Sequence, residues 1–378
     1  MAGPCVLFDT GPLGGGTGFR APQRIISAET PAEVPAAFAA LETALAEGAW
    51  LAGYASYELG YLGSVKLRDL MPAERGMPLL RFGVFDGPEP HTFQDDVFQD
   101  DMGVASLSAL TPDWDFAQYK AAFAQVQDFI TAGDIYQANL TFGMEGRFTG
   151  TPTALYARLR QRQQVEHGAF VDLGGPVLLS RSPELFFALN ADGHLTARPM
   201  KGTARRGMDA VEDAKLRADL VASEKNMAEN LMIVDLLRND ISRIAEVGSV
   251  EVPKLFEIET YETLHQMTSR ITAQVLPETR LTDIFNALFP CGSITGAPKI
   301  RAMQILRALE PAPRDAYCGA VGWIAPSGAM QFNVAIRTAT CHADGRLRLN
   351  VGGGVVHDST AEDEYAEALL KARFAALP

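Results

Sequence analysis

The chain has 378 residues, of which 47% are hydrophobic and 21% charged, values that exclude the collagen-like and intrinsically disordered classes. Its 33 Lys and Arg residues against 46 Asp and Glu residues give a formal net charge of -13, which is unfavourable for binding a nucleic-acid backbone. No run of about 18 apolar residues and no signal-peptide pattern occurs, so we expect a cytoplasmic protein with neither membrane nor nucleic-acid partners.

The four cysteines, Cys5, Cys291, Cys318 and Cys341, lie far apart in the sequence and form no CxxC pair. No histidine stands near them at the spacing of a zinc-ligand set. The sequence therefore indicates neither a zinc site nor a disulfide framework.

The first part of the chain predicts a mixed segment. A strand at Val6–Phe8 and a helix over Pro35–Glu47 precede strand-like runs at 51–63 and 78–87. Residues 88–114 lack a periodic apolar pattern and contain turn-forming sequences, which favours a linker. We therefore distinguish an N-terminal region, residues 1–105, from a second region, residues 115–376.

The second region begins with a predicted helix that starts after Asp115 and ends at Gly133. Strands are predicted within residues 135–148, 177–180, 185–189, 194–200, 252–275, 317–324, 330–340 and 346–351. One long helical pattern covers Glu212–Ala245, and another helix closes the chain. Adjacent runs of strands with separate helices indicate an α+β fold with largely antiparallel sheets.

The final helix is predicted to begin with a capping box formed by Ser359 and Glu362. Apolar residues then recur at helical spacing, which predicts a buried stripe of Ala366, Leu370, Phe374 and Leu377.

Three charged residues of this helix, Glu364, Glu367 and Lys371, share one face beside the stripe. Taken alone, that face is typical of solvated charges with a Glu–Lys pair. However, the consecutive glycines Gly352–Gly354 precede the helix, and their backbone amides can approach an anion closely. Glycines beside carboxylates favour a site for a small acid bridged by a metal.

A second acidic helix carries Glu224, Glu229, Asp235 and Asp240. Carboxylates from separate helices can hold Mg²⁺, which keeps most of its waters and needs few protein ligands. The alternative is an amphipathic helix with a wet acidic face.

Residues 291–297, CGSITGA, predict a loop ahead of a helix with Pro298 in its first turn. The residue order differs from the GxxxxGK[ST] phosphate loop, so nucleotide binding is not supported. The loop either presents Thr295 and backbone amides to a carboxylate or is a tight turn used only for packing.

Glu184 and Lys201 each fall at a predicted strand boundary, where side chains are often aimed into a cleft. A lysine before glycine is usually a solvated loop charge, whereas a desolvated lysine is an amine nucleophile. His265, inside a predicted strand, is either an acid–base group or a hydrogen-bonded core residue.

Together these segments resemble the chorismate-utilising enzymes, which include anthranilate synthase component I, aminodeoxychorismate synthase component I, isochorismate synthase and salicylate synthase. The resemblance covers about residues 115–376 through collinear motifs: GDIYQANL, SPELF, RPMKGTARR, SEKNMAENLMIVDLLRND, FPCGSITGAPKIRAM, YCGAVGW, FNVAIRT and VGGGVVHDSTAEDEYAEALLKA. It implies two packed antiparallel sheets flanked by helices, in which both regions form one intertwined unit. Chorismate would bind in a cleft between the sheets.

The resemblance also implies roles for individual residues. Glu229 and Glu367 would hold Mg²⁺, with Glu364 nearby. Glu184 would be the general acid that protonates the departing 4-hydroxyl. A catalytic His265 and Thr295 would line the same pocket, and the substrate carboxylates would bind Tyr317, Arg337, Lys371 and the amides of Gly352, Gly353 and Gly354.

Two positions distinguish the family members. Isochorismate and salicylate synthases carry a lysine where this chain has Gln137, and a glutamine cannot accept the proton of an attacking water. Anthranilate synthases carry an alanine where this chain has Lys201. The resemblance thus implies the aminodeoxychorismate branch, in which Lys201 attacks C2 of chorismate and ammonia then attacks C4.

This branch would convert chorismate and ammonia into 4-amino-4-deoxychorismate, for 4-aminobenzoate and folate biosynthesis. The sequence contains no glutaminase signature, so ammonia would come from solution or from a glutamine amidotransferase subunit, component II. Anthranilate synthase component I is the alternative enzyme. A non-catalytic binding protein of the same fold is the alternative class, disfavoured because Glu184, Lys201, Glu229 and Glu367 are all present.

Overall fold

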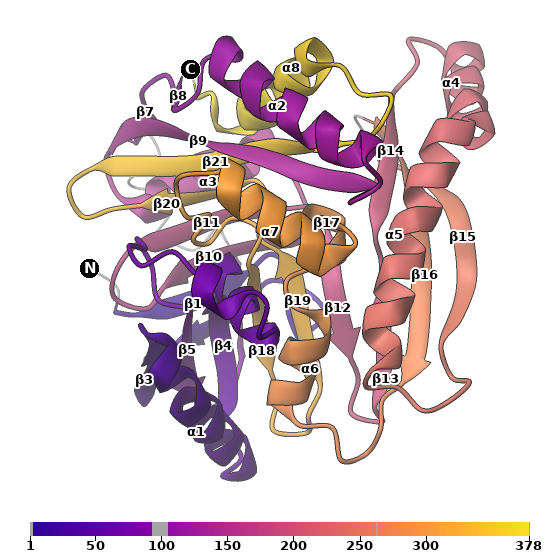
Figure 1. The fold of residues 1–378 in the computed structure, drawn as a ribbon. Helices are drawn as coiled ribbons and strands as arrows, with labels where there is room; N and C mark the ends of the chain where they lie inside the picture. Colours follow the sequence, from indigo (N-terminus) through magenta and orange to yellow (C-terminus); the bar gives the residue numbers. More distant parts are fainter. Residues whose placement is uncertain (1–2, 93–104, 262–263, 378) are drawn as a thin grey trace.

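The computed structural model describes residues 3–92, 105–261 and 264–377. Within them the strands form two antiparallel sheets, and helices cover the sheets (Figure 1). Side chains from both sheets meet in a shared apolar core that includes Val6, Leu178, Tyr54 and Val321. The predicted α+β class with two packed antiparallel sheets is confirmed.

The first sheet, sheet A, is built around the long strand β9. Its spatial order is β17 (Gly296–Ala297), β9 (Gln137–Thr149), β21 (Arg346–Val355), β20 (Thr338–Cys341), β11 (Val177–Ser182), β10 (His167–Asp172), β1 (Cys5–Phe8), β2 (Thr17–Arg20) and β6 (Glu89–Pro90). The short strands β7 (Ser106–Leu107) and β8 (Thr111–Pro112) also pair with β9.

The second sheet, sheet B, is ordered β14 (Met200–Arg205), β16 (Leu264–Gln274), β13 (His194–Ala197), β12 (Leu185–Leu189), β19 (Met330–Val334), β18 (Ala320–Ile324), β4 (Trp50–Ala55), β5 (Leu80–Phe85) and β3 (Arg24–Ala28). Strand β15 (Glu251–Thr260) also pairs with β16.

The helices divide between the sheets. An apolar core beside sheet A contains residues of α2 (Phe116–Thr131), α3 (Pro152–Arg162), α7 (Lys299–Leu309) and α8 (Ala361–Lys371). A second core, beside sheet B, contains residues of α1 (Val34–Ala46), α5 (Glu224–Ser242) and α6 (Leu281–Leu288). No helix among the described residues is long and apolar enough to cross a membrane.

The N-terminal strands are inserted among strands from the rest of the chain. In sheet A, β1 pairs with β10, and in sheet B, β4 pairs with β18. Each pairing places residues from the first sixty beside residues more than 150 positions later. Both sheets therefore need both ends of the chain.

Two N-terminal predictions need revision. The strand-like run 51–63 is a strand only as far as Ala55, because Tyr57–Gly63 forms the 3₁₀ helix η2. Gly60 there lies so close to Pro290 that an added Cβ would stand 2.3 Å from Pro290 Cδ. The predicted linker at 88–114 lies partly outside the described residues, and its described ends form β6, β7 and β8.

The single long helix predicted over Glu212–Ala245 is wrong. The chain forms α4 (Ala210–Ala222) and then α5, and Ser223 between them has an extended conformation. Its side chain accepts a hydrogen bond from the Asn226 backbone amide, the usual arrangement at a helix N-terminus. A helical pattern of apolar residues does not reveal such a break.

The predicted buried stripe of α8 is also wrong at its start. The helix is capped by Thr360, whose hydroxyl accepts from the Asp363 amide, so the predicted capping box of Ser359 and Glu362 is wrong. Leu370 is 56% exposed, whereas Ala368 is fully buried and Tyr365 stacks against Phe142 of β9. The buried face of the helix therefore passes through Tyr365 and Ala368, beside the predicted stripe.

A buried ion pair fastens the end of β1 to sheet A. Arg181 Nη1 lies 2.6 Å from Asp9 Oδ2, and the two side chains are 0% and 7% exposed. Asp9 also accepts hydrogen bonds from Tyr156 and Arg160. The carboxylate thus compensates a guanidinium that has no access to water.

Replacing Asp9 with alanine should lower the free energy of unfolding by about 3–5 kcal/mol, because Arg181 would remain buried without a counter-ion. Urea unfolding measures the change. Asp235→Ala, which removes an exposed pair with Arg238, is the control and should leave the midpoint nearly unchanged. Equal midpoints for both variants would contradict the assignment.

Candidate active site

Lys201, the second residue of β14, extends from sheet B to the glycines of sheet A. A Cβ added to Gly354 of β21 would stand 2.9 Å from the Lys201 amine. Burial lowers the pKa of this amine, the Glu229 carboxylate opposes the change, and the Lys371 ammonium reinforces it. The surroundings therefore favour a neutral, nucleophilic amine.

Glu184 lies between β11 and β12 and is 5% exposed. Ser293 donates a hydrogen bond from Oγ to Glu184 Oε1 at 2.8 Å. Burial raises the pKa of this carboxyl to about 7, although the Ser293 hydrogen bond and the Lys201 charge counteract it. Near neutral pH the group can thus donate or accept a proton.

Gln137, at the start of β9, is fully buried, and neither of its amide atoms has a hydrogen-bond partner in the structure. A Cβ on Gly354 would lie 3.0 Å from its Nε2, so the amide adjoins the same glycine as Lys201. An unpaired buried amide costs free energy unless a ligand pairs with it. Gln137 is therefore available to a bound molecule.

The triple glycine does not lie directly ahead of the final helix, as expected from the sequence. Gly352, Gly353 and Gly354 lie within β21, paired with Thr141, Leu140 and Asn139 of β9, and α8 begins only at Ala361. Their lack of side chains has a different reason. A Cβ on Gly353 would stand 2.4 Å from Glu364 Oε2, so glycine lets carboxylate, amine and strand approach closely.

The carboxylates come from two helices, Glu364 and Glu367 from α8 and Glu229 from α5. Glu364 accepts a hydrogen bond from Ser359, while Glu367 pairs with Lys371 at 2.8 Å. Burial and the Glu367 charge raise the pKa of Glu364. Burial also opposes ionisation of Glu367, but Lys371 and Lys201 outweigh it and lower its pKa.

These donors fit Mg²⁺ in chemical type, since carboxylate oxygens are its preferred ligands. The carboxylate of Glu364, whose pKa burial raises, would also be stabilised by a cation. Within the part of the chain that the structure describes, however, no three His, Cys, Asp or Glu side chains gather as a metal-binding group. Here the Lys371 ammonium pairs with the Glu367 carboxylate.

Arg337 lies between β19 and β20, where the chain passes from one sheet to the other. Its φ is +50°, a left-handed conformation that non-glycine residues rarely adopt and that tends to occur at functional sites. Burial alone lowers the pKa of its guanidinium, and no carboxylate of the described residues offsets that effect. An uncompensated buried cation favours binding of an anion.

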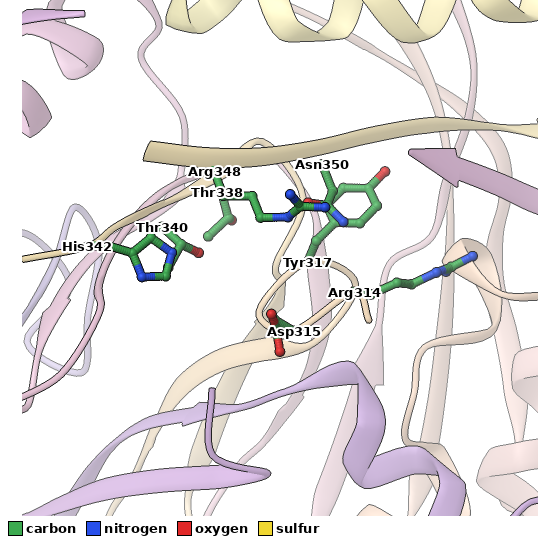
Figure 2. A pocket seen from close by; sticks show the side chains of 8 residues that line it. All are labelled: Arg314, Asp315, Tyr317, Thr338, Thr340, His342, Arg348 and Asn350. Carbon is green, nitrogen blue, oxygen red and sulfur yellow. The ribbon is translucent and has the colours of Figure 1, made fainter. Parts of the chain in front are cut away.

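Tyr317 is 7% exposed and borders a small polar cavity (Figure 2). The cavity volume is about 10 Å³, near the lower limit for a single water and far too small for a ring-shaped substrate. Its lining comprises Arg314, Asp315, Tyr317, Thr338, Thr340, His342, Arg348 and Asn350. This cavity is therefore not the substrate pocket, although Tyr317 lies at its edge.

Two predicted site residues have their polar atoms engaged within the protein. The ring of His265, which is 1% exposed, lies 3.0 Å from Asp213 at Nε2 and 2.9 Å from Thr260 at Nδ1. The Thr295 hydroxyl donates to the Cys291 and Gly292 carbonyls within its own loop. In this arrangement both side chains form hydrogen bonds within the protein.

Sequence reasoning missed Ser293, two residues before Thr295 in the same loop. Its hydroxyl, rather than that of Thr295, reaches the candidate acid Glu184. The contact joins residues 109 positions apart, so the sequence carries no direct signal for it.

Comparison with known proteins identifies the family of the chain. Residues 18–376 match the model of the chorismate binding enzyme family. The aminodeoxychorismate synthase component 1 of Escherichia coli (strain K12) is 42% identical over 266 residues, which cover 69% of this chain and 58% of that protein. An aminodeoxychorismate synthase of Streptomyces griseus is 44% identical over 246 residues, 65% of this chain and 34% of that protein.

Among solved structures, anthranilate synthase component I from Streptococcus pneumoniae TIGR4 is similar with a TM-score of 0.80 and 25% identity, covering 99% of this chain and 93% of that one. The matched segments span 58% or less of the length of the two curated relatives. The family match, in contrast, extends over nearly all of the present residues. This chain therefore belongs to the chorismate binding enzyme family.

Proposed function

We propose that the chain converts chorismate and ammonia into 4-amino-4-deoxychorismate, for 4-aminobenzoate and folate biosynthesis. The observation that carries the proposal is the Lys201 amine, whose pKa burial lowers, beside Gly354 and within electrostatic range of Glu184. Similarity to proteins named aminodeoxychorismate synthase supports the same activity.

In the first step the neutral Lys201 amine attacks C2 of chorismate, both conjugated ring double bonds shift by one position, and the C4–O bond breaks. Glu184 gives its proton to the departing hydroxyl, which leaves as water. In the second step ammonia attacks C4, both double bonds shift back, and the C2–N bond to Lys201 breaks as the surplus proton of the attacking nitrogen passes to the departing amine. The amine is regenerated and the new nitrogen remains at C4.

The other predicted residues would hold the substrate. Arg337, Lys371 and Tyr317 would bind its carboxylates together with the glycines of β21, and Gln137 would hydrogen-bond beside the ring. Thr295 supports the loop that carries Ser293, and His265 supports β14 through α4. Much of the catalysis would then be positioning and electrostatic stabilisation.

We further propose that Glu229 and Glu367 hold Mg²⁺, with Glu364 nearby. The cation would offset the negative charge of the ring carboxylate. Lys371, which now pairs with Glu367 at 2.8 Å, would be freed for substrate.

Removing divalent cations with EDTA should therefore abolish turnover, and excess Mg²⁺ should restore it. Glu367→Gln should raise the Mg²⁺ concentration needed for half-maximal rate by at least about tenfold, because one charged ligand is lost. Glu362→Gln, an exposed substitution on the same helix, should leave that concentration unchanged. Full activity in EDTA would refute the metal proposal.

The nitrogen donor is proposed to be ammonia released by a glutamine amidotransferase subunit. Similarity to proteins named component 1 supports the existence of such a second component. Glutamine should support turnover only when an amidotransferase is added, whereas ammonium chloride should support it with this chain alone.

Anthranilate synthase activity is the second candidate, favoured by the structural similarity to anthranilate synthase component I. Incubation with chorismate, Mg²⁺ and ammonium distinguishes the two activities. We expect a non-fluorescent amino product that retains the enolpyruvyl group. Direct formation of fluorescent anthranilate would overturn the proposed function.

A further inference from the structure

A buried arginine outside the proposed chemistry connects several parts of the site. Arg314, in the segment between α7 and β18, is 3% exposed. Its Nε and Nη2 each donate to Glu310 at 2.8 Å, so the carboxylate holds the guanidinium on one edge. The guanidinium also lies 4.5 Å from the centre of the Tyr57 ring in η2.

The guanidinium also donates hydrogen bonds to two backbone carbonyls. Nη1 donates to the Ile294 carbonyl at 3.1 Å and Nη2 to the Asn139 carbonyl at 2.7 Å. Ile294 directly follows Ser293, and Asn139 lies two residues after Gln137 on β9. One guanidinium therefore joins the loop that contacts Glu184 to the strand that carries Gln137.

The orientation of the Arg314 side chain is consistent with its joining the loop to β9. Figure 2 shows its side chain pointing away from Thr340 and His342, on the opposite side of the cavity. The same loop and strand are joined independently, since the Asn139 amide donates to the Thr295 carbonyl at 2.9 Å. Arg314 thus adds a further connection, at the residue beside Ser293.

We propose that Arg314 is a positioning residue: held by Glu310, it fixes the Ile294 and Asn139 carbonyls and so keeps the Ser293 hydroxyl on Glu184. The inference rests on the proposed function, in which Glu184 is the acid. It needs an arginine, because only a planar fork can satisfy a carboxylate and two carbonyls in different directions.

The test follows the pKa of Glu184, the proposed proton donor, through the pH dependence of activity. Because the Ser293 hydroxyl donates to the ionised carboxylate, losing that contact should raise the Glu184 pKa and move the alkaline limb of the pH profile upward. Lys201 and Cys291 are the other ionisable groups recorded as interacting with Glu184 in the described residues, and both stay unchanged.

We expect Arg314→Lys to lower kcat about tenfold or more and to raise the alkaline limb by about one pH unit, as for losing one hydrogen bond to a charged group. Ser293→Ala should shift the limb equally. The double variant should shift it no further, because both changes remove the same contact.

Arg181→Lys is the matched control. Arg181 is equally buried and ion-paired, but its side chain contacts Asp9, Tyr156 and the Gln163 carbonyl instead of the loop. It should lower thermal stability and leave the alkaline limb in place.

The proposal would be overturned if Arg314→Lys kept the alkaline limb of the wild type. It would also be overturned if the shifts of the two single variants added in the double variant. If Arg314→Lys does not fold, Glu310→Gln replaces it with the same expected shift and the same overturning outcomes. Activity is measured as consumption of chorismate, which does not depend on the identity of the product. An unexpected product would therefore count against the proposed function and not against the role of Arg314.

Discussion

Replacing Lys201 by alanine should abolish a covalent adduct that the wild-type chain forms with chorismate when ammonia is absent. Without ammonia the second displacement cannot occur, so the ring should stay attached to the amine after loss of water. Intact-protein mass spectrometry should show the added mass only on the wild type. Ammonia-dependent turnover of the variant should fall at least about 100-fold, because the attacking group is lost.

An exposed lysine provides the control for that experiment. Lys254 on β15 has a 46% exposed side chain paired with Glu257, so Lys254→Ala should retain both adduct and turnover. An unchanged adduct on Lys201→Ala would refute the nucleophile. Loss of the adduct from both variants would show that the alanine changes act through the fold.

The second large effect concerns Glu184. Its acid form must give a proton to the leaving hydroxyl, and burial raises its pKa to about 7. As pH rises through that value the protonated fraction falls, so the rate should decline about tenfold per pH unit on the alkaline side. Glu184→Gln should cost about 10²–10⁴-fold in kcat and lose this alkaline limb, because an amide does not titrate.

The acid limb of the profile has the opposite sign. Lys201 must be neutral to attack, so activity should fall as pH decreases through its pKa, which burial lowers. Rate measurements of kcat/KM across pH test both limbs. An alkaline limb that persists at the same pH in Glu184→Gln would assign it to a different group.

Local patterns predicted much of the fold. Helix α2 begins at a capping box of Asp115 and Gln118 and keeps its apolar spacing, so its bounds were readable. The break at Ser223 and the rotation of α8 were not, because a single cap and a Tyr365 ring override an otherwise continuous pattern. Composition and periodicity do not distinguish these tertiary choices.

The candidate site, like the fold, was only partly predictable from local sequence patterns. Lys201, Glu184 and Gln137 were identifiable from motifs, and the structure brings them toward one region around Gly354. Ser293 and Arg314 were not, because their importance comes from contacts with residues far away in sequence. A serine in a loop and an arginine between elements carry no distinguishing local pattern.

The interleaved strands have a consequence for synthesis of the protein on the ribosome. One edge of β1 pairs with β2 and one edge of β4 with β5, but the other edges must wait for β10 and β18, which are synthesised much later. Such long-range pairing slows folding and leaves open strand edges exposed meanwhile. The nascent chain therefore depends on protection from aggregation until most of its length has been translated.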